Sequence, residues 1–332
     1  MHTNLKDLME RKFPLGFFPT PVHALKNLSG RYKDYTVYIK RDDQTGLASG
    51  GNKTRKLEYL IREALDQGCD TVITAGAQQS NHCRQTAAAC NLAGLQCHLL
   101  VRGHEPDAFN GNLLLSKLLG ARIHYVGEEI KTSHVETLKS QLAAEGRRPY
   151  YTPIGGSTLT GALGFVGAAG ELKAQLEDMN LTVDTIFFAS CSGGTQAGLV
   201  LGKSLYSLAA TLMPVRIEKS VPGTSGLEET LKDLVFRGKE RLNIRQNFGP
   251  GDMALVKGYD HAGYGVMTQE EKTAIHELAR EEGIFLDPVY TARAFYAMSD
   301  HLQRRLIKPG STVLFWHTGG FPANFHYGKA LL

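Results

Sequence analysis

The sequence predicts an α/β fold with two lobes, in which parallel sheets are flanked by helices. Short apolar runs alternate with amphipathic segments along most of the 332 residues, and such alternation indicates parallel βαβ units. The chain is long enough for two separate cores. A stretch rich in Gly, Ser and Thr, residues 153–164, interrupts the alternation and is the best candidate for a crossing between the lobes.

The composition is that of a globular protein, with 42% hydrophobic and 21% charged residues and a formal net charge of +4. The charges are spread along the chain, which argues against a nucleic-acid partner. No stretch approaches the roughly 18 apolar residues of a membrane span, and the N-terminus lacks the apolar core of a signal peptide. The five cysteines are odd in number and form no CxxC. We therefore expect a cytoplasmic protein with reduced thiols, no membrane partner and no metal site.

In the first half, strands and helices alternate regularly. A proline-containing segment precedes a short strand at 35–40, and an amphipathic helix begins at Thr54 and ends near Gly68. The patterns then predict strands at 71–75, 96–101, 122–126 and near Tyr150, and helices at 81–93, 109–119 and 135–144.

The second half repeats this alternation with longer elements. The patterns predict helices at 164–178, 198–210 and 270–282, a further helix after the turn at Asp287, and strands at 183–190, 213–218 and 312–317. Residues 243–265 show no clear period and contain five glycines, so we expect a long loop there.

Lys53 follows two glycines and lies where a helix begins. The helix dipole disfavours a cation at that end, so an amine held there has a lowered proton affinity, which suits a nucleophile. The alternative is a solvated basic patch of Lys53, Arg55 and Lys56.

The segment Ser192-Gly193-Gly194-Thr195 follows a buried strand and opens a helix. Its backbone N–H groups converge on an anion site, for which a phosphate is the natural ligand. A nicotinamide dinucleotide fits less well because Thr195 replaces the middle glycine of that fingerprint, although Glu218 stands where a ribose-binding acid would lie. The third alternative is a tight turn without a ligand.

Ser80 and Asn81 follow the strand at 71–75, at the sheet edge where ligands of open α/β sheets bind. One of them can cap the next helix while the other contacts a ligand. His82 is predicted to be a packed or surface histidine.

Tyr264, between two glycines, and Tyr290, at the end of a turn, can each present a phenol to a cleft. Thr318 follows the last strand and is a candidate to hydrogen-bond a neutral heteroaromatic nitrogen. Each of these three also has a purely structural alternative as a turn residue.

Together, the segments IKRDDQTGLASGGNKTRKLEYL, TAGAQQSNHCRQTAA, SGGTQAG, LDPVYTARAF and HTGG resemble the fold-type II pyridoxal-phosphate enzymes, in the branch of D-cysteine desulfhydrase and 1-aminocyclopropane-1-carboxylate (ACC) deaminase. The resemblance covers nearly the whole chain. It implies a tryptophan synthase β-like fold with a large pyridoxal-phosphate-binding domain, residues 1–52 plus 162–332, and a smaller inserted domain, residues 53–161. It also implies a homodimer.

The resemblance assigns roles to the candidate residues. Lys53 forms the Schiff base with pyridoxal 5'-phosphate and Asn81 hydrogen-bonds the cofactor's 3-hydroxyl. Ser80 lies beside the substrate carboxylate, and Tyr264 and Tyr290 flank the reacting carbon. The remaining cofactor-binding residues are Ser192, Gly193, Gly194 and Thr195 around the phosphate and Thr318 at the pyridine nitrogen.

Two positions separate the branches of the family. Thr291 and Thr318 stand where the deaminases carry a glutamate and a leucine, and this favours the desulfhydrase branch. The expected activity is α,β-elimination of a small amino acid, D-cysteine first, to pyruvate, hydrogen sulfide and ammonia. ACC deamination is the alternative, as is a non-catalytic cofactor carrier. Gln79, at a position that looks usually apolar in relatives, leaves room for another β-substituted alanine such as cysteate. The base that removes the α-proton is either Lys53 or a tyrosine.

Overall fold

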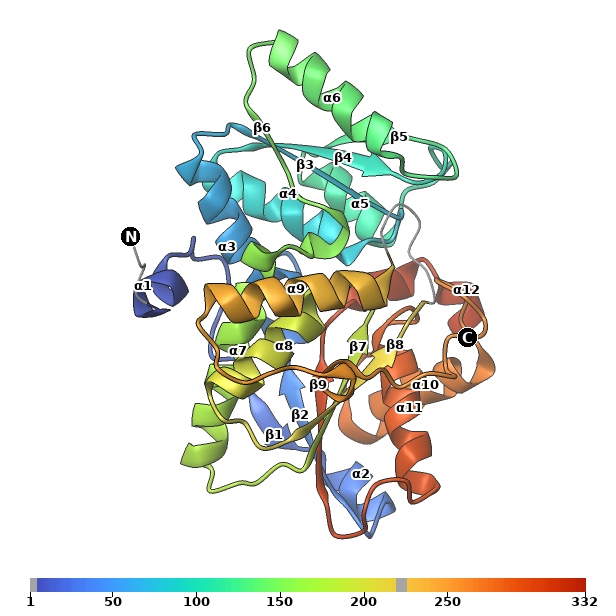
Figure 1. The fold of residues 1–332 in the computed structure, drawn as a ribbon. Coiled ribbons are helices and arrows are strands. Elements are labelled where there is room, and N and C mark those ends of the chain that lie inside the picture. Colours follow the sequence, from blue (N-terminus) through green and yellow to red (C-terminus); the bar gives the residue numbers. More distant parts are fainter. Residues whose placement is uncertain (1–4, 219–225) are drawn as a thin grey trace.

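The strands of the protein form two separate sheets in the computed structural model, which describes residues 5–218 and 226–332 (Figure 1). The five-stranded sheet has the order β1-β2-β9-β7-β8, with strands Val22–Ala24, Thr36–Arg41, Thr312–His317, Thr185–Ser190 and Thr211–Arg216. The four-stranded sheet has the order β5-β4-β3-β6, with strands Arg122–Tyr125, Gln96–Val101, Thr71–Gly76 and Pro149–Tyr151. Only β1 pairs in antiparallel fashion among these strands.

Helices flank both sheets. They are α1 (Leu5–Glu10), α2 (Lys26–Arg31), α3 (Lys53–Asp66), α4 (Asn81–Ala93), α5 (Gly111–Leu118), α6 (Thr132–Ala144), α7 (Leu159–Asp178), α8 (Gly194–Leu205), α9 (Leu227–Arg241), α10 (Gln269–Glu282), α11 (Thr291–Gln303) and α12 (Gly328–Leu331). Four short 3₁₀ segments are η1 (Asp42–Gln44), η2 (Ile154–Gly156), η3 (Pro250–Met253) and η4 (Phe321–Phe325). The predicted α/β class with parallel strands flanked by helices is confirmed.

Most predicted elements agree with the structure within a few residues. Helix α7, however, begins at Leu159 and not at the predicted residue 164, inside the stretch expected to cross between the lobes. Elements α1, β1, α2 and α12 were not predicted. Helix α8 begins at Gly194, four residues before the predicted start at 198, because its glycines let it lie close against α7. A Cβ at Gly198 would lie 2.3 Å from the carbonyl oxygen of Ala162. Helix α9 was not predicted, although Leu227, Leu231 and Leu234 are buried against the rest of the molecule.

Helix α3 lies between the two lobes and packs against both (Figure 1). Leu57, Leu60 and Ile61 belong to the core that α4 and the four-stranded sheet share. Tyr59 packs instead with residues of α7, α8 and α9. The helix that begins with Lys53 is therefore fixed from both sides.

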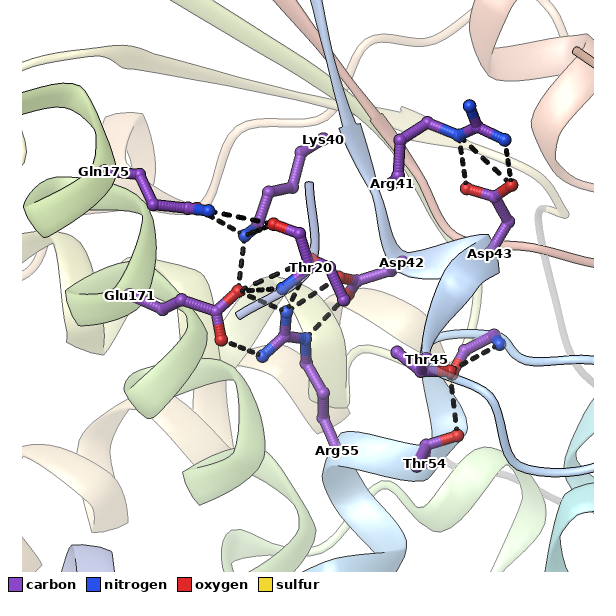
Figure 2. Close-up of polar contacts among 11 residues, drawn as sticks. Thr20, Lys40, Arg41, Asp42, Asp43, Thr45, Thr54, Arg55, Glu171 and Gln175 are labelled. Carbon is purple, nitrogen blue, oxygen red and sulfur yellow. Dashed lines mark hydrogen bonds and ion pairs between the residues drawn. The ribbon is translucent and has the colours of Figure 1, made fainter. Parts of the chain in front are cut away.

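Arg55, in the first turn of α3, anchors this helix to the five-stranded lobe through buried charges (Figure 2). It donates two hydrogen bonds of 2.8 Å to the carboxylate of Asp42 and two of 2.9 Å to that of Glu171 on α7. The guanidinium beside Glu171 holds the pKa of that carboxyl at about 2 against the opposing effect of burial. Such a paired cluster becomes costly when one member is removed.

Lys40 of β2 completes the cluster (Figure 2). Its ammonium contacts Glu171 and donates to Gln175 Oε1 at 2.6 Å and to the carbonyl oxygen of Thr20 at 2.9 Å. Burial lowers the pKa of Lys40, although both neighbouring carboxylates oppose this. Two buried cations thus face two carboxylates, and the cluster joins β2, η1, α3 and α7.

The four-stranded sheet and the helices α4, α5 and α6 are built from one continuous part of the chain, residues 71–151 (Figure 1). The domain limits at residues 53 and 161 stay a prediction. Within residues 5–218 and 226–332, no helix is long and apolar enough to cross a bilayer.

Candidate active site

A cavity lies where the carboxyl ends of strands from both sheets meet. It encloses about 1040 Å³ of atom-free space, its open mouth included. Nine of the ten residues predicted for the site line it: Lys53, Ser80, Asn81, Ser192, Gly193, Thr195, Tyr264, Tyr290 and Thr318. The tenth, Gly194, begins α8 immediately behind this wall.

Lys53 is the first residue of α3, and its Nζ donates to Asn52 Oδ1 at 3.0 Å. Burial is the largest influence on this amine and lowers its pKa to about 8, while Cys191 and Asp287 act in the opposite direction. The expected lowering of proton affinity is therefore present, and its largest cause is loss of water. At neutral pH an appreciable fraction of this lysine is the uncharged nucleophile.

The turn before Lys53 has an unusual backbone. Four consecutive residues, 48–51, have positive φ, and a Cβ at Gly50 would lie 2.0 Å from the carbonyl oxygen of Asp43. Side chains hold this turn: Thr45 Oγ1 accepts from the Gly51 amide at 2.8 Å, and Arg84 donates to the Gly50 carbonyl at 2.9 Å. Left-handed conformations outside glycine are strained, and they persist where the surroundings enforce them.

Residues 192–195 form the expected turn at the N-terminus of α8. Gly193 has φ +84°, which favours glycine. Ser157, which lies between η2 and α7, also contacts this turn. Its hydroxyl lies 2.8 Å from Ser192 Oγ and accepts a hydrogen bond from the Gly194 amide at 3.2 Å. Asn52 donates to Thr195 Oγ1 at 3.2 Å, which ties this turn to the residue preceding Lys53.

Lys56 was missed as a site residue by the sequence analysis. Its side chain is buried, its Nζ donates to the Gly155 carbonyl at 3.0 Å, and a Cβ at Gly194 would lie 2.8 Å from that Nζ. Burial, then the charge of Lys53, holds its pKa well below the usual range. A lysine three residues after Lys53 lies on the same helix face, and that spacing was the available signal. An anion at this turn would stabilise its charged form.

Ser80 and Asn81 divide the two tasks expected of them. Ser80 is the N-cap of α4 and accepts from the Cys83 amide at 3.2 Å. Asn81 lines the cavity, and its Oδ1 accepts from Asn112 Nδ2 at 2.9 Å. Both therefore face the cavity from a helix N-terminus, where free amides favour an anion.

His82 lines the cavity but is packed, and Gln79 has structural surroundings. His82 is buried, its Nε2 lies 2.9 Å from Thr74 Oγ1, and burial holds its pKa well below the usual range, which agrees with the predicted packed histidine. Gln79 does not line the cavity: its Oε1 accepts from the Asn112 amide at 2.8 Å at the start of α5. Its polar character is thus explained by this contact.

The phenols of Tyr264 and Tyr290 are within 2.5 Å of each other at the cavity wall. Burial raises the pKa of both above the usual range, so both are protonated near neutral pH. Asp287 fixes the turn that carries Tyr290, since its carboxylate accepts from the amides of Tyr290 and Thr291 at 3.1 and 2.8 Å.

The two threonines used to separate the family branches lie in different places. Thr318 lines the cavity, and its carbonyl accepts from the Asn52 amide at 2.9 Å. Thr291 is fully buried outside the cavity lining, where its hydroxyl donates to Asp287 at 2.7 Å. Thr291 therefore supports the turn, and Thr318 alone stands where a ligand can be contacted.

The sequence of the whole chain places this site in a known class of enzymes. Residues 14–319 match the model of the pyridoxal-phosphate dependent enzyme family. The chain belongs to this family and is a pyridoxal-phosphate-dependent enzyme of fold type II.

Individual relatives resemble the chain over most of its length. A putative ACC deaminase of Pyrococcus abyssi is 39% identical over 337 residues, covering 100% of this chain and 99% of that protein. A D-cysteine desulfhydrase of Yersinia enterocolitica is 40% identical over 314 residues, covering 93% of each. The crystal structure of an ACC deaminase homologue superposes with a TM-score of 0.88 at 37% identity, covering 100% and 99% of the two chains. Relatives named for either substrate are thus about equally similar to this protein.

The residues present fit pyridoxal phosphate. An amine with a pKa of about 8 lies in the cavity wall for covalent attachment. The phosphate has a glycine turn at a helix N-terminus, where a side chain on Gly194 would collide with Ser157 Oγ at 2.9 Å. The buried amine of Lys56 beside this turn has no carboxylate to pair with among the described residues, and a phosphate dianion would compensate it.

Proposed function

We propose that the protein catalyses the α,β-elimination of a small β-substituted amino acid, with D-cysteine as the first candidate and pyruvate, sulfide and ammonia as products. The observation that carries this proposal is the arrangement around the cavity, where the Lys53 amine, the helix start at Ser80 and the phenol pair share one space. When bound, the cofactor supplies an electron sink conjugated with the substrate's Cα.

Each residue has a task in this proposal. Lys53 holds the cofactor and, once the substrate has replaced it, serves as the base that removes the α-proton. Its pKa of about 8 suits that role, because a general base works best near the operating pH. The two tyrosines are protonated, so they are hydrogen-bond donors to the substrate and not bases. Ser80, at the N-terminus of α4, receives the substrate carboxylate.

The cofactor's remaining contacts follow from the same geometry. Residues 192–195, with Lys56 and Ser157 behind them, receive the phosphate. Asn81 and Thr318 line the same cavity. Asn81 would hydrogen-bond the cofactor's 3-hydroxyl, and Thr318 its pyridine nitrogen. A neutral hydroxyl at Thr318 favours elimination of a good leaving group over the opening of a cyclopropane ring, which demands stronger electron withdrawal.

ACC deamination is the second candidate activity, because relatives with that name are as similar as the desulfhydrases. One experiment separates the activities: the absorbance spectrum of the cofactor-loaded protein, together with 2-oxo acid formation from D-cysteine, L-cysteine, cysteate, β-chloro-D-alanine and ACC. The four β-substituted alanines give pyruvate, and ACC gives 2-oxobutanoate. Faster turnover of ACC than of D-cysteine would reverse the assignment. A loaded protein that releases a 2-oxo acid from none of the five would be the non-catalytic carrier.

We also propose that the enzyme works in the cytoplasm as a homodimer. The apolar side chains exposed near the junction of α5 and η4 support a second copy as partner: Leu114, Leu118, Phe285, Phe321 and Phe325. The rings of Phe285, Phe321 and Phe325 form a continuous series with centroid separations of 5.5 and 5.4 Å. Light scattering of the purified protein tests this, and a monomeric mass at micromolar concentration would exclude it.

A further inference from the structure

Arg102 stands apart from the other charged residues of the cavity. It follows β4 directly and lines the cavity as a partly buried residue. Its backbone amide donates to the carbonyl of Gly76 at 3.0 Å, which places it beside the end of β3. The turn from Gly76 to Ser80, which receives the substrate carboxylate in the proposal above, therefore begins on the neighbouring strand.

The guanidinium of Arg102 has no protein partner in the described part of the chain: no hydrogen bond or ion pair involves it. Two buried arginines of the five-stranded lobe, by contrast, are paired with carboxylates, Arg55 with Asp42 and Arg293 with Glu271, whereas the buried Arg84 donates to the Gly50 carbonyl. A cation that is partly removed from water and left unpaired is unfavourable. An anion entering the cavity would relieve that cost.

We infer that Arg102 binds a second anionic group carried on the substrate's Cβ, so that the substrate class extends from D-cysteine to acidic β-substituted alanines. This rests on the proposed elimination and names its substrate class. The α-carboxylate is assigned to the N-terminus of α4, where Ser80, Asn81 and His82 line the cavity. Adjacent strands lie about 4.8 Å apart, and the two anionic groups of such an amino acid are separated by about 4 Å across three bonds. The spacing therefore suits one anion on each strand end.

The other charged groups of the cavity have separate roles and do not compete with Arg102 for the second anionic group of the substrate. Lys53 is committed to the cofactor, and residues 192–195 to its phosphate. Glu218, the acidic residue of the lining, follows β8 of the five-stranded sheet. Its charge contributes to raising the pKa of the Cys191 thiol, so Glu218 belongs to the opposite wall. The cavity thus has a cation on the wall of the four-stranded sheet and a carboxylate across from it.

The reaction balances for a β-sulfonate. The base takes the α-proton, the Cα–H electron pair forms the Cα=Cβ bond, and the Cβ–S bond breaks with its electrons on sulfur, releasing sulfite. The resulting aminoacrylate takes up water to give pyruvate and ammonium. Arg102 lowers the cost of charge on the departing group and needs to transfer no proton itself.

The test compares the cofactor-loaded wild type, Arg102→Gln and the control Arg122→Gln, an exposed arginine on β5 that does not line the cavity. Two ligands without an amino group cannot react: 3-sulfopropanoate carries the second anion, and 3-mercaptopropanoate carries a neutral thiol at pH 7. Calorimetric titration should show that the wild type and Arg122→Gln prefer the sulfonate. Arg102→Gln should lose roughly 10- to 100-fold of affinity for the sulfonate and less than threefold for the thiol.

Pyruvate formation from both enantiomers of cysteate and of cysteine gives the kinetic counterpart. We expect kcat/KM for cysteate to fall selectively in Arg102→Gln and to return in part in Arg102→Lys. Equal loss of both ligands would assign Arg102 to the α-carboxylate and overturn the inference, as would unchanged sulfonate binding. If the wild type eliminates from no amino acid yet binds the sulfonate through Arg102, the proposed reaction fails and the anion site stands.

Discussion

The hydroxyl oxygens of Tyr264 and Tyr290 lie 2.5 Å apart, with their rings inclined at 73°. Both phenols are protonated at neutral pH because burial raises their pKa values. One hydroxyl therefore donates to the other, and the second keeps its proton for a ligand. The pair acts as one donor built from two side chains.

Phenylalanine substitutions test this pairing. Tyr264→Phe and Tyr290→Phe should each lower kcat/KM for D-cysteine about 10- to 100-fold, and the double variant should cost little more than the worse single variant, because both changes remove the same donor. Tyr206→Phe, outside the cavity lining, is the control. The wild-type pH profile should show no tyrosine ionisation below pH 10. Fully additive losses would mean that the two phenols act separately.

Gly194→Asp tests the phosphate turn. The new side chain would meet Lys56 Nζ at 2.8 Å and Ser157 at 2.9 Å and would place a carboxylate where the phosphate is expected. Affinity for pyridoxal phosphate, measured by absorbance titration, should fall at least about 100-fold. Gly249→Asp, whose Cβ meets nothing within 4 Å, should leave it unchanged. Unchanged cofactor affinity in Gly194→Asp combined with loss of NADH binding would favour the dinucleotide alternative.

Lys53 should limit the stability of the cofactor-free protein. Its folded pKa of about 8 lies below the usual 10.5, so between these two pH values the unfolded chain binds more protons than the folded one. The free-energy penalty on folding is therefore complete below pH 8, and it disappears as the pH rises from 8 to 10.5. Lys53→Met should therefore raise the free energy of unfolding at pH 7 by about 3 kcal/mol. It should also abolish the adduct that borohydride reduction traps. Denaturant unfolding at pH 7 and 10 measures the first effect, and a retained adduct would place the attachment at another lysine.

Glu171→Gln tests the buried charge cluster. Removal of this carboxylate leaves Lys40 and Arg55 undercompensated and should cost about 3–5 kcal/mol. Because the folded pKa of Glu171 is lowered to about 2, its contribution is complete above pH 4.5 and is lost as the pH falls toward 2. The exposed Glu177→Gln, which breaks only the pair with Lys173, should change stability by less than 1 kcal/mol. Similar urea midpoints for the two variants would contradict this prediction.

Thr318 should direct the choice of substrate. A threonine hydroxyl stays uncharged and can hydrogen-bond the cofactor's ring nitrogen without protonating it, and each unit of pyridine pKa corresponds to roughly a tenfold change in rate. We expect kcat/KM for D-cysteine to exceed that for ACC by about 100-fold or more. Thr318→Val should reduce elimination about tenfold and should not increase ACC turnover. An ACC rate above the D-cysteine rate in the wild type would refute this assignment.

Local patterns allowed most elements to be predicted because caps and periods agreed with the tertiary structure. Helix α4 begins at Asn81 and ends before Gly94, as its N-cap serine and left-handed glycine predicted. The start of α8 was placed late because Gly194 and Gly198 lower helix propensity locally, while close packing on α7 requires them. Tertiary contact decided that boundary.

The site could be predicted as far as its motifs extend along the chain. Lys53, Asn81 and Thr318 belong to such motifs and reach one cavity. Lys56 had a local signal in its spacing from Lys53, but the positions of Ser157 and Arg102 depend on where distant segments meet, which no local pattern contains. The same limit explains why Thr291 and Gln79 were expected near the ligand. Their side chains instead hydrogen-bond Asp287 and the Asn112 amide.

The hydrogen bond from the Asn52 amide to the Thr318 carbonyl has a consequence for biosynthesis. Asn52 and Thr318, which lie 266 positions apart in the sequence, are thus joined in one turn. Strand β2 also pairs in parallel with β9, so it has no parallel neighbour until β9 has been synthesised. When the helix that begins with Lys53 and the whole four-stranded lobe have been translated, the cavity still lacks the walls formed by later residues. Binding of pyridoxal phosphate should therefore begin only after translation has passed Gly319. In a chain stalled earlier, the Lys53 amine would lack the buried surroundings that lower its pKa.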